Sequence, residues 1–217
     1  ETGVGQSETF LTEACEYTNS FLSFFPTIGI ILNIDADHLD FFKDIDDIRH
    51  SFRKFAELLP AEGALIINAD TPKYEMITEN LPCKVITYGL EHDAEYSASD
   101  ITYDEFGHPT FHVLHNGADI GICSLKVPGI HNVSNALASI AAGRLLGLDN
   151  EVIFAGLKDF GGTDRRFQYK GKVGEVTIID DYAHHPTEIE ATLHAANNYP
   201  HKKIWCVFQP HTYTRTK

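Results

Sequence analysis

Short apolar runs alternate with polar stretches through the first half of the chain. The runs Ile28–Ile34, Ala64–Asn68 and Lys84–Tyr88 are rich in β-branched residues, and we expect each of them to form a strand. We expect a further strand at Phe10–Cys15. Ile45–Leu59 carries apolar residues at helical spacing and ends at a proline, which predicts an amphipathic helix. Alternating strands and helices are typical of an α/β protein with a mostly parallel sheet.

The pattern changes after about Asp93. Polar and apolar residues alternate there between turn signals at Phe106-Gly107 and Asn116-Gly117, which predicts a small antiparallel meander. An alanine-rich stretch, Gly129–Gly147, then predicts a long helix, and Asp149–Leu157 predicts a short one. The meander and the flanking helices complete the first predicted unit.

A second unit is expected after the glycine pair Gly161-Gly162, which is the best candidate for a hinge. Val176–Ile179 is a short β-branched and apolar run, and it predicts a fully buried parallel strand that ends on two carboxylates. Pro186 then opens a helical pattern, and Ile204–Phe208 predicts the next strand. The chain reaches Lys217 before this second sheet is complete.

Polar residues gather in the predicted loop between that strand and that helix. Open α/β sheets bind their ligands at this position, and the loop carries Asp180, Asp181, His184 and His185. The same four side chains are potential ligands of a transition metal, so a metal-dependent phosphohydrolase is one open alternative. A non-catalytic nucleotide-binding domain is another.

Two further candidates follow predicted strands of the first unit. Glu13 ends one strand and His38 follows another, and a carboxylate with an imidazole at such a crevice can hold a divalent cation against phosphate oxygens. The alternative is a helix cap for the acids between Asp35 and Asp40, with a solvated histidine. The residues alone leave both open.

The first turn of the alanine-rich helix carries His131, Asn132 and Asn135. Side-chain amides at a helix N-terminus can bind a base or a ribose, although asparagine there is more often a cap. Arg165 and Arg166 follow the expected hinge, where positive charge can be brought onto a nucleotide when two domains close. Adjacent arginines are more often surface charge, so both signals are weak by themselves.

Composition narrows the choice of partners. The net charge of −14 repels a phosphate backbone, so we expect no nucleic-acid partner. The chain lacks an apolar run of membrane-spanning length, and we expect no membrane partner. Its four cysteines have no CxxC spacing, which favours reduced thiols and a cytoplasmic location.

Six segments resemble the Mur ligases, and most closely the alanine-adding members of that family. The segments are TEACEYTNSF, NIDADHLDFF, GIHNVSNALA, DRRF, DDYAHHPTE and FQPHTYTRT. The resemblance implies residues 1–160 as the central ATP-binding domain, and residues 161–217 as the incomplete start of a Rossmann-like α/β C-terminal domain that binds the amino acid. It also implies an ATP- and Mg²⁺-dependent ligase of peptidoglycan synthesis, joining L-alanine to UDP-N-acetylmuramate through an acyl phosphate.

The family's site residues carry over to matching positions of this sequence. Glu13 and His38 match magnesium ligands around the transferred phosphate, and with Arg166 they are the expected catalytic residues. The nucleotide site would contain His131, Asn132, Asn135, Arg166 and Asp181, with Asp181 as the ribose- or nucleotide-facing partner of Arg166. The amino-acid pocket would contain Tyr182, His184, His211 and Arg215, with Arg215 on the alanine carboxylate. His185 is expected to be structural.

Three departures from the family pattern matter. Cys15 stands where many relatives have an acid, and Phe52 stands where later-acting members have a lysine, which fits the alanine-adding members. The sequence has no GxxGKT phosphate loop, and no lysine lies beside Gly3 or Gly5. We therefore expect the 217-residue chain to be inactive by itself.

Overall fold

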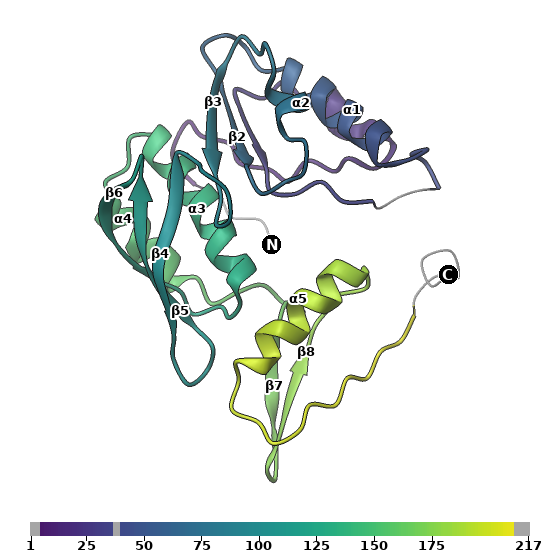
Figure 1. Cartoon of the computed structure of the whole chain (residues 1–217), viewed down its shortest axis with the longest axis vertical. Helices are drawn as coiled ribbons and strands as arrows, with labels where there is room; N and C mark the ends of the chain where they lie inside the picture. The colour runs from purple at the N-terminus through teal and green to yellow at the C-terminus, as the bar shows by residue number, and fades with distance from the viewer. Residues whose placement is uncertain (1–4, 37–39, 211–217) are drawn as a thin grey trace.

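The computed structural model describes residues 5–36 and 40–210. Its larger part is built on one six-stranded sheet in which the strands lie side by side in chain order (Figure 1). The strands are β1 (Ile28–Ile31), β2 (Ala64–Asn68), β3 (Lys84–Tyr88), β4 (Tyr96–Tyr103), β5 (Pro109–His115) and β6 (Ala118–Ser124). The first three are parallel, one residue pair joins β3 to β4 in parallel, and β4 to β6 form an antiparallel meander.

Helices cover both faces of this sheet (Figure 1). One face carries the 3₁₀ segment η1 (Tyr17–Ser23), α1 (Ile45–Glu57) and the short α2 (Glu75–Thr78), and the other carries α3 (Ile130–Leu145) and α4 (Asn150–Asp159). Alternate residues of a strand face opposite sides, so β2 sends Ile66 toward α3 and Leu65 toward α1. Both are fully buried, which is why this strand reads as a continuous apolar run.

Local signals set the limits of α1 and α2. The carboxylate of Asp44 caps α1 by accepting the backbone N–H groups of Asp46 and Asp47 at 3.1 and 2.9 Å. α2 cannot begin before Lys73, because Lys73 has a φ of 63°, which a right-handed helix cannot contain.

A smaller unit follows the glycine pair. It consists of the hairpin of β7 (Gln168–Val173) and β8 (Val176–Asp180), followed by α5 (Pro186–Asn197) (Figure 1). α5 also touches the first unit: Ala195 is buried, and a Cβ placed on Gly129 would come within 3.3 Å of the Ala195 Cβ. Tyr199, just beyond the helix, lies 5.9 Å from the ring of Phe106 in the meander.

The expected fold class is confirmed, as are the strands of the first unit from β1 onward, the meander and the long helices. The division into domains at residues 160 and 161 stays a prediction. Within the described residues no helix has the length and apolar character needed to cross a bilayer.

Three strand predictions are wrong in pairing or in existence. Phe10–Cys15 is an exposed irregular segment, and so is Ile204–Phe208; neither finds a partner strand among the described residues. Val176–Ile179 does form a strand, β8, but it pairs antiparallel with β7 and its residues are exposed or half-buried. Apolar composition predicts that a segment favours a sheet, whereas the neighbour that completes the ladder lies elsewhere in the chain.

Candidate functional site

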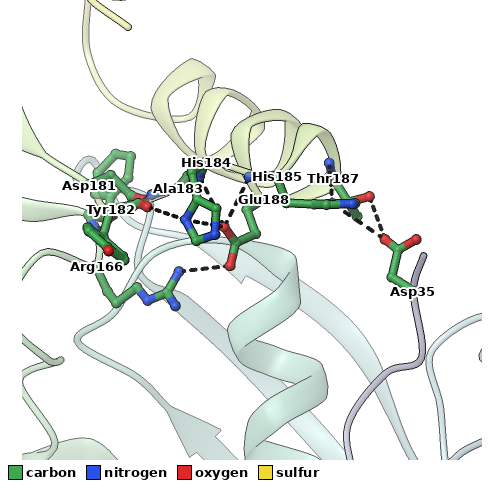
Figure 2. A network of polar contacts seen from close by, with 10 residues as sticks. Asp35, Arg166, Asp181, Tyr182, Ala183, His184, His185, Thr187 and Glu188 are labelled. Atoms are coloured by element: carbon green, nitrogen blue, oxygen red, sulfur yellow. Dashed lines mark hydrogen bonds and ion pairs between the residues drawn. The ribbon is translucent and has the colours of Figure 1, made fainter. Parts of the chain in front are cut away.

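The N-terminal end of α5 is the best-defined part of the candidate site (Figure 2). His185 is its N-cap, Pro186 occupies the first turn, and Glu188 completes a capping box. One oxygen of Glu188 accepts the backbone N–H groups of His184 at 3.1 Å and His185 at 3.4 Å. The His185 ring accepts the N–H of Thr187 through Nδ1 at 3.4 Å. The loop that precedes the helix is thereby fixed by its own side chains.

Arg166 joins this network through the other oxygen of Glu188. Its Nη1 donates to Glu188 Oε1 at 3.3 Å (Figure 2). Burial opposes ionisation of Glu188, but the two backbone N–H groups and Arg166 outweigh it and lower the pKa of that carboxyl. The side-chain partner of Arg166 is thus Glu188 of α5, and the expectation that Arg166 and Asp181 face a nucleotide together stays a prediction.

The side chain of Asp181 accepts hydrogen bonds from backbone N–H groups. Its two oxygens accept the N–H of Phe167 at 2.8 Å and of Ala183 at 2.7 Å, and the Tyr182 N–H donates to the Arg165 carbonyl at 2.7 Å. Arg165 and Phe167 both have positive φ, 60° and 46°, which costs roughly 1 kcal/mol or more for each non-glycine residue. The strained backbone on either side of Arg166 is thus held in place by the end of β8.

The first turn of α3 lies beside the same segment. Burial lowers the pKa of His131, the charge of Asp181 opposes this shift, and the charge of Arg166 adds to it. His131 still has an exposed surface, so a ligand can reach it. The neighbouring Asn132 donates through Nδ2 to the Pro128 carbonyl at 2.8 Å and meets His131 Nε2 at 3.2 Å. Asn135 is exposed.

Two of the residues expected in the amino-acid pocket lie together. His184 Nδ1 is 3.0 Å from the carbonyl oxygen of Tyr182, and the two rings meet edge to face at 5.4 Å. The Tyr182 ring is about half exposed, and the Arg165 guanidinium lies over it at 5.8 Å. His211 and Arg215 lie outside the described residues, so their expected places in the pocket stay predictions.

The expected magnesium ligands are less well defined. Glu13 is exposed in an irregular segment, so the expectation that it ends a buried strand is wrong. His38 lies outside the described residues. Across residues 5–36 and 40–210, no three His, Cys, Asp or Glu side chains are grouped in a way that could hold a metal ion. The role of Glu13 as a ligand stays a prediction.

The polar cluster after β8 does not form a transition-metal site. Asp180 lies 3.7 Å from the Lys170 Nζ, Asp181 accepts two backbone N–H groups, and His185 caps α5. His184 turns its Nδ1 to a backbone carbonyl. Each of these side chains has a different partner, so the four do not converge on one metal ion. This arrangement disfavours the phosphohydrolase alternative.

Comparison with protein families decides the assignment. The profile described as Mur ligase middle domain matches residues 4–143, and that described as Mur ligase, glutamate ligase domain, matches residues 165–217. The chain belongs to the Mur ligase family. The resemblance seen in the six sequence segments is therefore confirmed.

Several Mur ligases are similar over the whole chain. A UDP-N-acetylmuramate–L-alanine ligase of Lachnospira eligens is 59% identical over 217 residues, which is 100% of this chain and 47% of the relative. A protein of the same name from Caldanaerobacter subterraneus is 53% identical, covering 99% of this chain and 46% of its own length. The chain thus spans about half the length of the curated relatives it matches.

Solved Mur ligases have the same fold. A UDP-N-acetylmuramate-alanine ligase of Thermotoga maritima aligns with a TM-score of 0.70 at 31% identity, over 83% of this chain and 40% of that one. A second T. maritima ligase, MurF, solved in complex with ADP, has a TM-score of 0.68 at 20% identity, which shows the fold alone.

Sequence reasoning missed the residues that organise this site, namely Glu188, Asp35 and Thr187. A signal for Glu188 was present, because a glutamate three residues after an N-cap marks a capping box. Here the N-cap is a histidine in place of the usual serine, threonine or asparagine, so the box is harder to recognise. No local signal pairs Asp35 with Thr187, which are 152 positions apart.

Proposed function

We propose that this chain is part of an ATP-dependent ligase that joins L-alanine to the carboxylate of UDP-N-acetylmuramate, in the cytoplasmic stage of peptidoglycan synthesis. The observation that carries the proposal is the match of this chain to the Mur ligase middle domain over residues 4–143 and to the Mur ligase, glutamate ligase domain over residues 165–217. The names of the relatives give the substrates, and the four free cysteines support a reducing compartment.

The nucleotide would lie at the first turn of α3. The exposed ring of His131 would accept a hydrogen bond from the exocyclic amine of adenine through an unprotonated nitrogen. The amides of Asn132 and Asn135 would contribute further contacts to the base or ribose. The guanidinium of Arg166 is about half exposed, so it is available to a phosphate while keeping its hydrogen bond to Glu188.

Glu13 and His38 would hold a magnesium ion beside the phosphates. Mg²⁺ keeps several waters and commonly takes only one or two carboxylates beside substrate phosphates, so a single exposed Glu13 carboxylate fits this role. When bound, the ion would neutralise charge on the polyphosphate. Cys15, which stands where relatives often have an acid, is exposed two residues away.

The reaction has two steps. A carboxylate oxygen of UDP-N-acetylmuramate attacks the γ-phosphorus of ATP, and ADP leaves. The amine of L-alanine then attacks the acyl carbon, the C–O bond to phosphate breaks, and the amine loses a proton. Arg166 would add positive charge near the moving phosphoryl group.

The amine must be held beside the acyl carbon for the second step. Tyr182 and His184 lie at the α5 end of the site and are proposed to line the amino-acid pocket, with His211 and Arg215 completing it. Most of the rate acceleration would come from holding the amine and the acyl carbon close together in the correct orientation.

Phosphate release tests the proposal. A protein of the relatives' length that contains this chain should release phosphate from ATP only when UDP-N-acetylmuramate and L-alanine are both present. The 217-residue chain should release none, because its sequence has no GxxGKT loop to hold the phosphates. ATP binding by the longer protein without substrate-dependent release would instead support a non-catalytic nucleotide-binding role.

A further inference from the structure

The start of α5 contacts the loop after β1 in the first unit (Figure 2). The Thr187 hydroxyl donates to Asp35 Oδ2 at 2.6 Å, and His185 Nε2 lies 3.4 Å from the Ala36 carbonyl oxygen. Asp35 Oδ1 accepts the N–H of Ala36 at 2.7 Å. Both oxygens of the carboxylate therefore have partners, and one partner comes from the other unit.

Each side of this contact is held in place by its own segment. His185 uses both ring nitrogens: Nδ1 accepts the Thr187 N–H, which leaves Nε2 to donate to Ala36. The capping box through Glu188 then sets the direction of Thr187. The Thr187 hydroxyl is also the main reason that the pKa of Asp35 is lowered, so the acceptor is the charged carboxylate.

The contact joins two loops with different expected tasks. Asp35 lies three residues before His38, the expected ligand beside the transferred phosphate, and Thr187 lies three residues after His184 of the expected amino-acid pocket. Glu188, next to Thr187, also holds Arg166. A shift of α5 relative to the β1 loop would therefore move the amine away from the acyl phosphate.

We propose that Asp35 and Thr187 are positioning residues, whose hydrogen bond holds the start of α5 against the β1 loop and thereby aligns L-alanine with the acyl phosphate. This role in the reaction rests on the proposed function. The far end of α5 has its own contacts, through Ala195 with Gly129 and Tyr199 with Phe106. Loss of the hydrogen bond should therefore let the helix pivot about that end, with the second unit still attached.

A distance measurement tests the contact in the 217-residue chain. Spin labels at Glu62→Cys and Glu190→Cys, two exposed positions in different units, report the separation after Cys15 and Cys206 are replaced by serine. Thr187→Val removes the hydroxyl with little change of shape. A net hydrogen bond of this kind corresponds to about a threefold to tenfold change in the ratio of displaced to docked helix.

The matched variants separate the hydroxyl from the helix itself. Thr187→Ser restores a donor and should restore the docked distance, and Asp35→Ala should reproduce the effect of Thr187→Val. Thr177→Val, the same change at an exposed position of β8, should leave the distance distribution as in the wild type. An unchanged distribution in both Thr187→Val and Asp35→Ala overturns the proposal.

Ligation by the longer protein tests the role in the reaction. Thr187→Val should lower kcat and raise KM for L-alanine, each about threefold to tenfold, with KM for ATP unchanged and with recovery in Thr187→Ser. A displaced helix with normal ligation would also overturn the proposal. Absence of ligation in the wild type would refute the proposed function, while the distance measurement would still decide whether the contact holds the units together.

Discussion

The two units of this chain bury their apolar residues to very different extents. In the first, the β2 residues Leu65, Ile66 and Ile67 are 0% exposed, because helices cover both faces of the sheet. In the second, Val176 of β8 is 62% exposed and Val207 is 97% exposed. The first unit thus has a complete core of its own, whereas much of the order of the second comes from turns, caps and contacts with its neighbour.

This difference bears on where the site lies. The expected nucleotide residues His131 and Asn132 begin a helix packed on the complete core, and the expected amino-acid residues Tyr182 and His184 stand on the less buried unit. In many enzymes, closure of two domains around the substrates completes the catalytic site. Each change below tests whether the two units differ in this way.

The largest effect is expected from an isoleucine in the first core. Ile66→Ala should lower the free energy of unfolding by about 2–5 kcal/mol, because it leaves a cavity in a fully buried site. Ile178→Ala in β8, 45% exposed, should cost less than about 1 kcal/mol. Urea unfolding followed by far-UV circular dichroism measures both, and equal losses would contradict the comparison.

A carboxylate should make the first unit sensitive to acid. Asp70 accepts the N–H groups of Leu90, Glu91 and His92 and meets the His92 ring. Burial opposes ionisation, but these hydrogen bonds outweigh it and lower the pKa of Asp70. The folded state therefore binds the proton less readily than the unfolded state, so the stabilisation is present above about pH 4 and is lost as pH falls further.

Asp70→Asn measures this contribution. The variant should be less stable than wild type by about 1–3 kcal/mol at pH 7, and the difference should shrink below about pH 4. Urea unfolding at a series of pH values provides the test. A difference that grows toward acid pH would contradict the assigned cause.

A glycine at the contact between the units should have a moderate effect. Gly129 has a φ of 99°, and a Cβ there would come within 2.6 Å of the His131 ring and 3.3 Å of Ala195. Gly129→Ala should cost about 1–3 kcal/mol and loosen α5 from the first unit. Urea unfolding followed by circular dichroism measures the loss of stability, and the spin-label distance between positions 62 and 190 reports the position of α5.

The control for this change is another glycine-to-alanine substitution. Gly156 lies within α4, and a Cβ there would meet no atom within 4 Å. Gly156→Ala should therefore stabilise the chain by about 0.5–1 kcal/mol. If the two substitutions changed stability equally, close packing at Gly129 would not be what holds α5.

The smallest effect on stability is expected from Arg166→Met. Its ion pair with Glu188 is partly exposed, so the loss should be below about 1 kcal/mol. In the longer protein, ATP affinity should fall about tenfold or more, because a charged contact to phosphate is lost. Lys172→Met, an exposed change in β7, serves as the control in calorimetric titrations with ATP. Equal affinities would remove Arg166 from the nucleotide site.

The sequence predicted the first unit well because its strands and helices carry strong local patterns. Ala64–Asn68 and Lys84–Tyr88 were delimited to the residue, since both are apolar runs bounded by turns. Phe10–Cys15 and Ile204–Phe208 failed because a strand also needs a partner, and local composition carries no information about one.

For the candidate site too, local motifs identified residues, whereas their long-range partners could not be read from the sequence. Motif resemblance pointed to Arg166 and Asp181, and the structure places Arg166 beside the start of α5 and Asp181 against the backbone of Phe167 and Ala183. The sequence could not predict that Glu188 would bind Arg166, or that Asp35 would bind Thr187 across 152 positions. These contacts depend on how separate segments of the chain pack together.

Isotope transfer tests the central claim, ligation through an acyl phosphate, most directly. UDP-N-acetylmuramate labelled with ¹⁸O in its carboxylate would be incubated with ATP, L-alanine, Mg²⁺ and the longer protein, and the released phosphate examined by mass spectrometry. The carboxylate oxygen that attacks the γ-phosphorus stays with phosphorus when the amine displaces phosphate. Each phosphate should therefore carry one ¹⁸O atom from the substrate. Unlabelled phosphate would mean that water attacks ATP, and would contradict the assignment.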